Sequence, residues 1–444
     1  MHRKIAVAAA ALLAACAHVA PTASPAPTEA STPTPTPTPA STPASTPTPT
    51  STSTSTPTPT SPPTSSSTSS STSGTAAPDR QPPLPLPRSG GGEGQGEGAA
   101  GREITFALVG DVMLGSTFPD GAVLPPDEGR GLLAPAAPLL SAADVAVGNL
   151  EGPMLEGGTS TKCARAKPGH CYAFRMPTAY AATLRAAGFR AMSVANNHAG
   201  DFGAEGRAST RAALDAAGVA HSGEPGDVAR LEVRGRKVAL VAFATSEATN
   251  DLRDLAAARR VVEGLAGEAD LVVVSFHGGA EGAAHQHVPE GSEEFYGEPR
   301  GDLRAFAHAM IDAGAALVFG HGPHVARGME IYRGRLVAYS LGNFATWGSF
   351  NLQGPNALAP LLTVRLGPGG AFLGGRVHAF RQEKPGGPRP DPSGEAIRRL
   401  RDLSREDFGA AAVQVADDGT LTAPPPPARA QRPAGSSMAA RGSP

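Results

Sequence analysis

Apolar runs and helical patterns alternate along the middle of the chain. Seven short runs rich in β-branched residues predict strands, at 104–109, 145–147, 191–194, 238–243, 271–276, 315–319 and 336–339. Amphipathic helical patterns lie between several of these runs, and each stops at a glycine: 177–187, 204–217 and 302–313. Several runs are apolar at every position, which is typical of central strands, so the alternation predicts an α/β fold.

Polar residues follow most of these runs, where each predicted strand ends. They are Asp111, Asn149, Glu151, Asn197, His198, Asp201, His277, Glu281, His321, His324 and Asn343. Any one of them alone is more often a turn former or a buried structural group, and His198 could simply bond Asp201. Because ligands collect at the carboxyl ends of strands in such sheets, we expect these residues to converge. Imidazole combined with carboxylate or amide oxygen suits Mn²⁺, Fe²⁺ or Zn²⁺, so the set predicts one divalent ion, with a second left open.

The N-terminus has the pattern of an export signal. His2-Arg3-Lys4 precedes an apolar run at 5–15, and Leu13-Ala14-Ala15-Cys16 has the form of a bacterial lipobox. We therefore expect a lipoprotein signal peptide at 1–16 and lipidation of Cys16. The alternative is an ordinary signal peptide cut before an incidental cysteine. The expected location is the cell envelope, periplasmic or at the cell surface, and the outer membrane if the organism has one.

Composition separates a folded region from two flanking segments. Residues 31–73 are all Ser, Thr, Pro or Ala, which cannot bury enough apolar surface to offset the ordering entropy. Residues 17–100 are therefore predicted to be a disordered tether, and the Pro- and Ala-rich residues 417–444 a disordered tail. The remaining residues, 102–409, are enough for one large domain.

The charge of the chain limits its expected partners, and its cysteines predict a disulfide. With 38 basic and 40 acidic residues the net charge is −2, and the folded region contains no basic run, so nucleic acid is not an expected partner. Besides Cys16 there are two cysteines, Cys163 and Cys171. In an exported protein they predict a local disulfide, and a metal pair with His170 is the weaker alternative.

Five motifs together resemble, in order and spacing, the CapA/PgsA family of capsule and poly-γ-glutamate synthesis proteins. They are Gly110-Asp111-Val112-Met113-Leu114-Gly115, Asn149-Leu150-Glu151-Gly152-Pro153, the segment 195–203, Gly320-His321-Gly322-Pro323-His324 and Tyr339-Ser340-Leu341-Gly342-Asn343-Phe344. The resemblance covers about 104–408, because 396–408 also looks like the closing helix of that family. It implies a four-layer α-β-β-α sandwich similar to the calcineurin-like metallophosphatases.

The same resemblance implies roles for individual residues. Asp111 corresponds to the first aspartate ligand, and Glu151 or Asn149 to the bridging carboxylate. Asn197 and His198 correspond to the Asn-His pair that binds metal and a reacting phosphate. The implied metal ligands are Asp111, Glu151, Asn197, His277, His321 and His324. A supporting or substrate-contacting role is left for Asn149, Asp201, Glu281 and Asn343.

The sequence also departs from the related patterns. Met113 stands where metallophosphatases carry the histidine of an Asp-x-His motif. Gly278 replaces an aromatic residue after His277, and Gly322 replaces a second histidine in a Gly-His-His-Pro-His motif. Residues 282–299, which include His285 and His287, do not align with the family, and these two histidines are expected at the surface. Ser340 lacks a Gly-x-Ser-x-Gly elbow, which indicates a structural role.

Three functions fit these observations. The first is an exported, lipid-anchored CapA-like protein that assists synthesis or export of an anionic polymer of the poly-γ-glutamate type. Its expected partners are the polymer or its precursor, a synthase or export complex, and the membrane. The second is a metal-dependent hydrolase, a phosphoesterase or an amidase, acting on a cell-envelope substrate. The third is a metal-free scaffold, so whether the protein is an enzyme is left open.

Overall fold

The computed structural model describes residues 103–119, 123–164, 171–348 and 350–425. All of them belong to the second of the two units, 1–88 and 89–444, into which the chain divides. The expected signal peptide with Cys16, the tether and most of the tail lie outside the described residues. Within the described ranges, no helix has the length and apolar character needed to cross a bilayer.

Nine strands form the first sheet, in the order β19-β20-β16-β15-β1-β2-β3-β4, with β14 beside the end of β1. Their bounds are β1 (Ile104–Met113), β2 (Val145–Leu150), β3 (Phe189–Ser193), β4 (Ala220–Ser222), β14 (Asn343–Thr346), β15 (Leu361–Leu366), β16 (Phe372–His378), β19 (Gln414–Val415) and β20 (Thr420–Thr422). Strands β1 to β4 and β14 are parallel, so their carboxyl ends share one edge. Strands β15, β16, β20 and β19 extend the sheet in antiparallel fashion.

Seven strands form the second sheet, in the order β12-β13-β11-β8-β6-β5, with β7 beside β6. Their bounds are β5 (Ala229–Val233), β6 (Arg236–Ala244), β7 (Asn250–Asp251), β8 (Leu271–His277), β11 (Leu317–His321), β12 (Met329–Tyr332) and β13 (Arg335–Ala338). The inner strands β6, β8, β11 and β13 are parallel. Two small hairpins complete the strands, β9 (Glu293–Phe295) with β10 (Glu298–Gly301) and β17 (Phe380–Gln382) with β18 (Pro388–Pro390).

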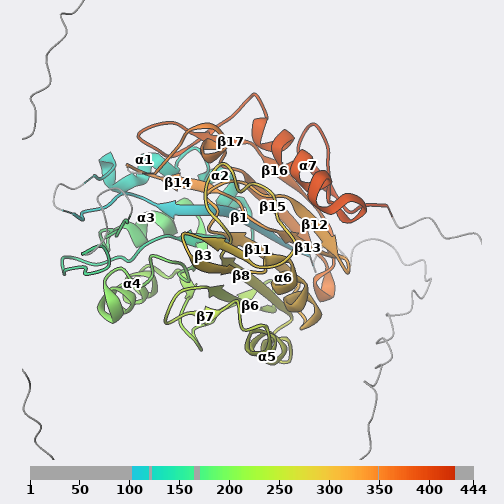
Figure 1. Cartoon of the computed structure of the whole chain (residues 1–444), viewed down its shortest axis with the longest axis horizontal. Coiled ribbons are helices and arrows are strands. Elements are labelled where there is room, and N and C mark those ends of the chain that lie inside the picture. The colour runs from blue at the N-terminus through green and yellow to red at the C-terminus, as the bar shows by residue number, and fades with distance from the viewer. Residues whose placement is uncertain (1–102, 120–122, 165–170, 349, 426–444) are drawn as a thin grey trace, which may run out of the picture. The chain divides into compact units, whose positions relative to one another are not determined.

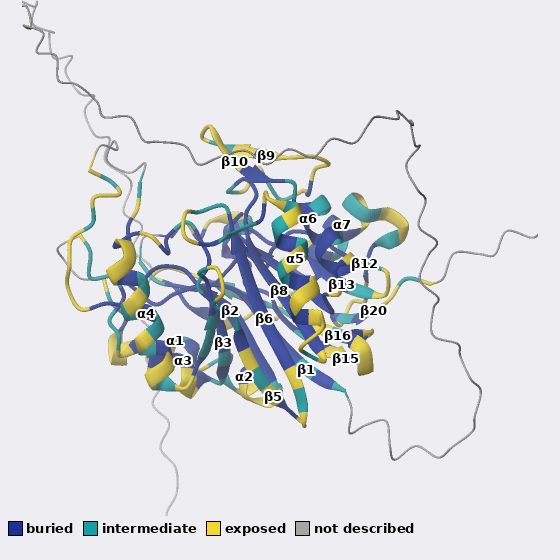
Figure 2. Ribbon diagram, turned by 90° about the horizontal axis from the view of Figure 1, so that it is seen from below, coloured by how far each residue is buried: buried dark blue, intermediate teal, exposed yellow. Residues whose placement is uncertain are grey.

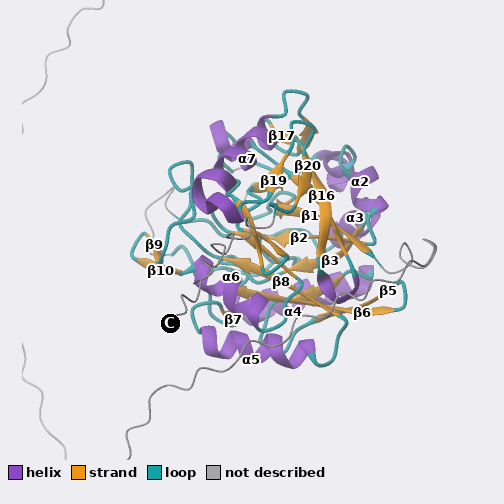
Figure 3. Ribbon diagram, turned by 90° about the vertical axis from the view of Figure 1, so that its right-hand side faces the viewer, coloured by secondary structure: helices purple, strands orange, loops and turns teal. Residues whose placement is uncertain are grey.

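The two sheets pack face to face, and helices cover their outer faces, except for the last helix at 395–408, whose Ile397 and Leu400 join the core between the sheets (Figures 1 and 3). The helices are α1 (Arg130–Leu133), α2 (Ala137–Ala142), α3 (Tyr180–Ala187), α4 (Gly203–Ala217), α5 (Leu255–Ala266), α6 (Leu303–Asp312) and α7 (Glu395–Phe408). Short 3₁₀ turns lie at Pro126–Gly129, Gly354–Ala357, Pro368–Gly370 and Gly409–Ala411.

Three apolar cores hold the four layers together, one between the sheets and one under the helices on each outer face. Leu108 and Phe319, one from each sheet, belong to the core between the sheets. Leu184 of α3 belongs to the core on the outer face of the first sheet, and Val262 of α5 to the core on the outer face of the second. Figure 2 shows the central strands buried and the exposed residues on the outer faces of the helices. These cores confirm the predicted four-layer α-β-β-α sandwich.

The C-terminal boundary predicted from composition is wrong. β19 pairs with β20, β20 pairs with β16, and Leu421 is buried, so the domain extends at least to Thr422 and residues 417–422 are not part of a tail. The domain likewise continues beyond 409. Composition missed these strands because they are two and three residues long and are separated by a turn through Gly419, whose φ is +87°.

Candidate metal centre

The candidate site lies where the carboxyl ends of strands from both sheets meet. Asp111 pairs in register with Asn149 and Asn343 in the first sheet. His321 pairs with His277 in the second sheet. β1 extends to Met113, so Asp111 lies inside the strand at a register shift and not after its end. The structure thus brings together residues that are far apart along the chain.

Asp111 is the central group of the site. It is fully buried, and its two oxygens accept hydrogen bonds from Asn149 Nδ2 (2.9 Å) and His324 Nδ1 (2.9 Å). His321 Nδ1 lies 3.6 Å from the first of these oxygens. Burial alone would raise the pKa of Asp111, but the hydrogen bond and charge of His324, with the other histidines, lower it to about 2. Asp111 is therefore a buried carboxylate anion.

The backbone before Asp111 admits only glycine. A Cβ on Gly110 would lie 1.9 Å from the carbonyl oxygen of Gly342 on the neighbouring chain segment. The N–H of Asp111 donates to that same oxygen at 2.8 Å. The Gly-Asp pair in the sequence is thus explained by close approach of two backbones, which fixes the direction of the aspartate.

Several polar atoms at the site are buried without a hydrogen bond. Among the described residues, both carboxylate oxygens of Glu151, both ring nitrogens of His321 and Nε2 of His277 have no hydrogen-bond partner. Each such atom costs about 1–3 kcal/mol, so a cluster of them indicates a ligand that would satisfy them. Carboxylate oxygen with imidazole nitrogen is a donor set that fits Mn²⁺, Fe²⁺ or Zn²⁺.

The histidines differ in protonation. Burial lowers the pKa of His321 to about 4 and that of His277 well below its ordinary value, so both are neutral with lone pairs available. Burial would also lower the pKa of His324, but the charges of Glu151 and Asp111 raise it to about 10. For Glu151, burial and the nearby charge of Asp111 raise the pKa well above its usual range.

His324 links the two carboxylates. Its Nε2 lies 3.5 Å from Glu151 and 4.0 Å from Glu281, which Arg300 holds by an ion pair of 2.8 Å. Asp111, Glu151 and His324 each offer a ligand atom, all within 4.8 Å of one another. The backbone of His324 has a φ of +56°, a left-handed conformation that is rare for a side-chain-bearing residue and is found at functional sites.

Two asparagines orient the cluster. Asn149 Nδ2 lies 3.4 Å from Nδ1 of His277 in addition to its bond with Asp111. Asn196, which the sequence reading did not select, donates to Asn149 Oδ1 at 3.0 Å and accepts from the N–H of His198 at 3.0 Å. The sequence marks Asn196 only by its place in the family-like segment 195–203, directly before the Asn197-His198 pair. Asn149 therefore acts as a supporting hydrogen-bond group beside the carboxylate Glu151.

Asn343 and Asn197 have different surroundings. Asn343 donates to the carbonyl oxygens of His324 and Asn356, both at 3.3 Å, and so supports the turn that carries His324. Asn197 is half-buried, and its Oδ1 has no hydrogen-bond partner in the described part of the chain.

His198 is held by a second carboxylate. Its Nδ1 lies 2.8 Å from Asp201, and its ring lies 4.3 Å from that of Phe174. Burial lowers the pKa of His198 despite the charge of Asp201. Lys162 Nζ lies 2.5 Å from Asp201 and 3.3 Å from Nδ1 of His198. The sequence reading missed Lys162, because a single lysine in a polar loop carries no pattern.

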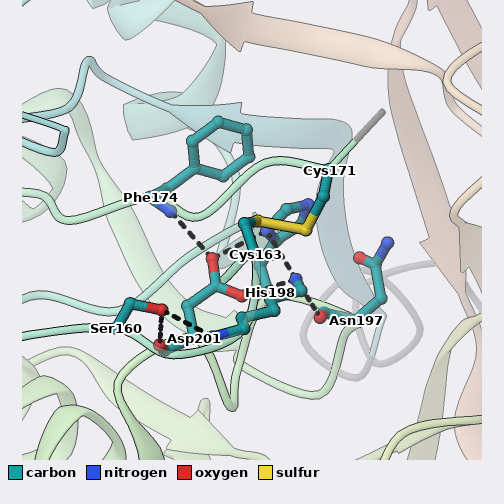
Figure 4. The surroundings of a disulfide bond; sticks show 8 residues. Ser160, Cys163, Cys171, Phe174, Asn197, His198 and Asp201 are labelled. Carbon is teal, nitrogen blue, oxygen red and sulfur yellow. Dashed lines mark hydrogen bonds and ion pairs between the residues drawn. A yellow bond between two sulfur atoms is a disulfide. The ribbon is translucent and has the colours of Figure 1, made fainter. Parts of the chain in front are cut away.

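Cys163 and Cys171 form the expected disulfide beside this pair, with their Cα atoms 5.6 Å apart (Figure 4). The alternative partner, His170, lies outside the described residues.

Gly278 and Gly322, the two glycines that depart from the family pattern, contact each other and form one structural feature. A Cβ on Gly322 would lie 2.7 Å from the carbonyl oxygen of Gly278, and the N–H of Gly278 donates to the carbonyl of His321 at 3.0 Å. The backbones after His277 and His321 are therefore in contact, which leaves no room for a side chain at Gly322. Met113 is buried in the apolar core, and its sulfur accepts from the N–H of Gly115 at 3.3 Å.

The remaining candidates lie apart from the cluster. His287 is exposed and pairs with Asp407 at 2.7 Å, and His285 contributes a carbonyl oxygen to Arg327 at 2.8 Å. Ser340 is fully buried and donates to the carbonyl oxygen of Val325 at 2.8 Å, which is a structural contact.

Comparison with known proteins places this geometry in a family. The family model described as "Bacterial capsule synthesis protein PGA_cap" matches residues 105–346, more than half of the chain. The capsule biosynthesis protein CapA of Bacillus anthracis is 29% identical over 262 residues, and the PGA biosynthesis protein CapA of Bacillus subtilis is 27% identical over 261. Each alignment covers 54% of this chain, and 59% and 63% of the respective relative. The chain thus spans less than two thirds of the length of these relatives.

Two solved structures were also matched. A hypothetical protein from Thermus thermophilus has a TM-score of 0.38 at 18% identity, over 63% of this chain and 100% of its own. A 5'-nucleotidase precursor from the same organism has a TM-score of 0.35 at 14% identity, over 71% of this chain and 61% of its own.

Proposed function

The chain belongs to the PGA_cap family of bacterial capsule synthesis proteins, and from that premise we propose that it assists the synthesis or export of an anionic polymer of the poly-γ-glutamate type. Relatives support this proposal by their descriptions as capsule or PGA biosynthesis proteins. A further relative from Mycobacterium tuberculosis, 30% identical over 230 residues, is described as a probable polyglutamine synthesis accessory protein.

One observation carries the proposed mode of action, namely the buried and unpaired donor atoms around Asp111. Glu151, His277 and His321 contribute them from both sheets. The residues that would hold a divalent cation are Asp111, Glu151, His277, His321 and His324. These orphaned atoms argue against a metal-free scaffold, because an apolar replacement would avoid their desolvation cost.

A bound cation would give the site the positive charge that an anionic ligand needs. Asp111 is a buried carboxylate, and His324 Nε2 lies 3.5 Å from Glu151 and 4.0 Å from Glu281. In the metal-free protein the charge of His324 only offsets that of Asp111, and Arg300 pairs with Glu281, so no net positive charge is left for a carboxylate of the polymer. A bound divalent cation would attract and polarise a carboxyl or phosphoryl oxygen. The chain's own residues fix the donor directions, through Asn149 for Asp111 and Asn343 for the His324 turn.

The proposed location follows from the N-terminal sequence, and the proposed polymer partners follow from the family. A lipidated Cys16 would attach the protein to the cell envelope, and the residues 17–100 would allow the domain to reach away from the membrane. We place the polymer or its precursor, and a synthase or export complex, as partners at that surface.

A second candidate function is hydrolysis of a phosphoester or an amide in the cell envelope. The observation that favours it is the His198–Asp201 pair, since a carboxylate bonded to Nδ1 orients the ring with Nε2 directed away. Such a histidine is suited to transfer a proton to a leaving group. In this reading Asn197 and His198 are the catalytic pair, as the family resemblance implies.

The test uses the full-length protein and its gene. We expect deletion of the gene in the source organism to reduce extracellular anionic polymer, and wild-type protein to restore it. The His321→Ala variant should fail to restore it, while the His285→Ala variant should succeed. Metal analysis of the purified proteins should show a divalent metal in the wild type and in His285→Ala only. Normal polymer levels in the deletion strain would refute the polymer proposal. Turnover of phosphodiester or amide substrates by purified protein, lost in His198→Ala, would favour the hydrolase.

A further inference from the structure

Two short segments joined by the Cys163–Cys171 disulfide contact the turn that carries His198 (Figure 4). These segments are residues 160–164, the first arm, and residues 171–174, the second arm; each contains one cysteine of the disulfide. Both arms lack regular helix or strand structure within the described residues. Their contacts converge on Asp201, the residue that orients His198.

The first arm contributes two residues. The hydroxyl of Ser160 donates to the backbone carbonyl of Asp201 at 2.6 Å. Lys162 donates to Asp201 Oδ1 at 2.5 Å and to the backbone carbonyl of Asn197 at 2.9 Å. Lys162 therefore bonds both ends of the turn from Asn197 to Asp201.

The second arm contributes Phe174. Its backbone N–H donates to Asp201 Oδ2 at 2.8 Å, and its ring packs against the ring of His198 at 4.3 Å. The Asp201 side chain is fully buried, so its charge-assisted bonds have little competition from water. Asp201 is thus held from both arms at once.

The disulfide joins the two arms next to these contacts. Cys163 follows Lys162 directly, and Cys171 comes three residues before Phe174. A lysine side chain loses rotamer entropy when it is fixed, and an irregular backbone arm loses backbone entropy as well. A covalent link between the arms reduces that cost by limiting the freedom of the open loop.

We propose that the Cys163–Cys171 disulfide holds Lys162 as a positioning residue, which pins the Asn197–Asp201 turn and so fixes the direction of the His198 ring. The order of this part of the site then depends on the oxidation state of two cysteines. The proposal goes beyond the proposed function, because it requires neither a bound metal nor a polymer. Opening the bond takes two electrons and two protons and gives two thiols, while dithiothreitol as reductant becomes its cyclic disulfide.

Hydrogen exchange of the full-length protein tests the proposal. We expect reduction by dithiothreitol to increase amide exchange in 196–203 at least threefold, with no change in β8. The Lys162→Gln variant should produce a similar increase in the oxidised protein, and Lys162→Arg should restore most of the protection. Lys237→Gln, a change of the same type at an exposed lysine of β6, is the matched control.

Combining the Lys162→Gln substitution with reduction of the disulfide separates this mechanism from a general loss of order in the two arms. If the disulfide acts through Lys162, reduction of Lys162→Gln should add little to the exchange already caused by the substitution. Fully additive effects, or unchanged exchange in 196–203 after reduction, would overturn the proposal. The ring protons of His198 give a second readout, because the Phe174 ring shifts their NMR frequencies. Reduction and Lys162→Gln should move these signals alike, and signals unmoved by both would also overturn it.

Discussion

His277 and His321 lie opposite each other as the last residues of the neighbouring parallel strands β8 and β11. The N–H of Gly278 donates to the carbonyl oxygen of His321, so the chain stays paired one residue beyond the strands. Both side chains are buried and both carry unpaired ring nitrogens among the described residues. This pairing makes the second sheet the source of neutral imidazoles, while the first sheet supplies carboxylates.

His321→Ala should remove a ligand and lower the affinity for Mn²⁺ or Zn²⁺ about tenfold or more. His285→Ala is the matched control, because the His285 ring lies against Phe295 and outside the cluster. Isothermal titration of the two purified variants makes the comparison. Equal affinity in both would exclude His321 from the ligand set.

Metal binding should release protons. In the metal-free protein the pKa of His324 is about 10, so this ring is protonated at neutral pH, whereas a ligand imidazole must be neutral. We therefore expect about one proton or more to leave per bound ion, and the affinity to rise from about pH 6 to about pH 9. Titration calorimetry in buffers of different ionisation enthalpy counts these protons. His324→Gln should reduce the count by about one, and buffer-independent heats in the wild type would contradict the assignment.

The stabilisation that protonated His221 gives the folded protein should be lost at high pH. Burial would lower the pKa of this histidine, but its hydrogen bond to Asp227 at 3.0 Å, with the charges of Asp227 and Asp215, raises it. Because the folded protein binds this proton more tightly than the unfolded chain, the stabilisation is complete below pH about 6.5 and is lost as pH rises through the folded pKa. Urea unfolding at about pH 6 and about pH 8.5 measures the loss. His221→Asn should show a smaller difference between these two pH values than the wild type, and an unchanged difference would count against His221.

Gly322→Ala should destabilise the protein strongly. The φ of +114° at Gly322 disfavours any side chain, by about 1–2 kcal/mol, and the added Cβ would overlap the backbone of Gly278. Gly226→Ala is a suitable control, because Gly226 has a φ of +85° and no described atom within 4 Å of its Cβ position. Chemical denaturation should show a clearly larger loss of unfolding free energy for Gly322→Ala. A loss no greater than that of the control would show that the backbone contact is easily relaxed.

The sequence predicted the elements that long apolar runs specify. β8 follows the run at 271–276 almost residue for residue, and the polar residues at strand ends pointed to one edge. The apolar pattern alone could not show that two sheets form that edge, since strand order depends on contacts between distant segments; the two sheets were implied only by the family resemblance. Asn196 and Lys162 escaped notice because each acts through hydrogen bonds that only the folded chain brings into reach. The pairing of Gly278 with Gly322 also joins positions far apart in the chain.

The origin of the centre in two sheets has a consequence for folding. Asp111 and Glu151 come from one side of the sandwich, and His277 and His321 from the other, so neither half of the domain holds the complete donor set. A divalent ion would therefore recognise the chain only after the sheets have docked, and would stabilise the native state over every partly assembled one. The ion would then hold the two sheets together only after they have packed. Its removal should raise the unfolding rate, at which the sheets separate, and leave the folding rate, at which they first associate, unchanged.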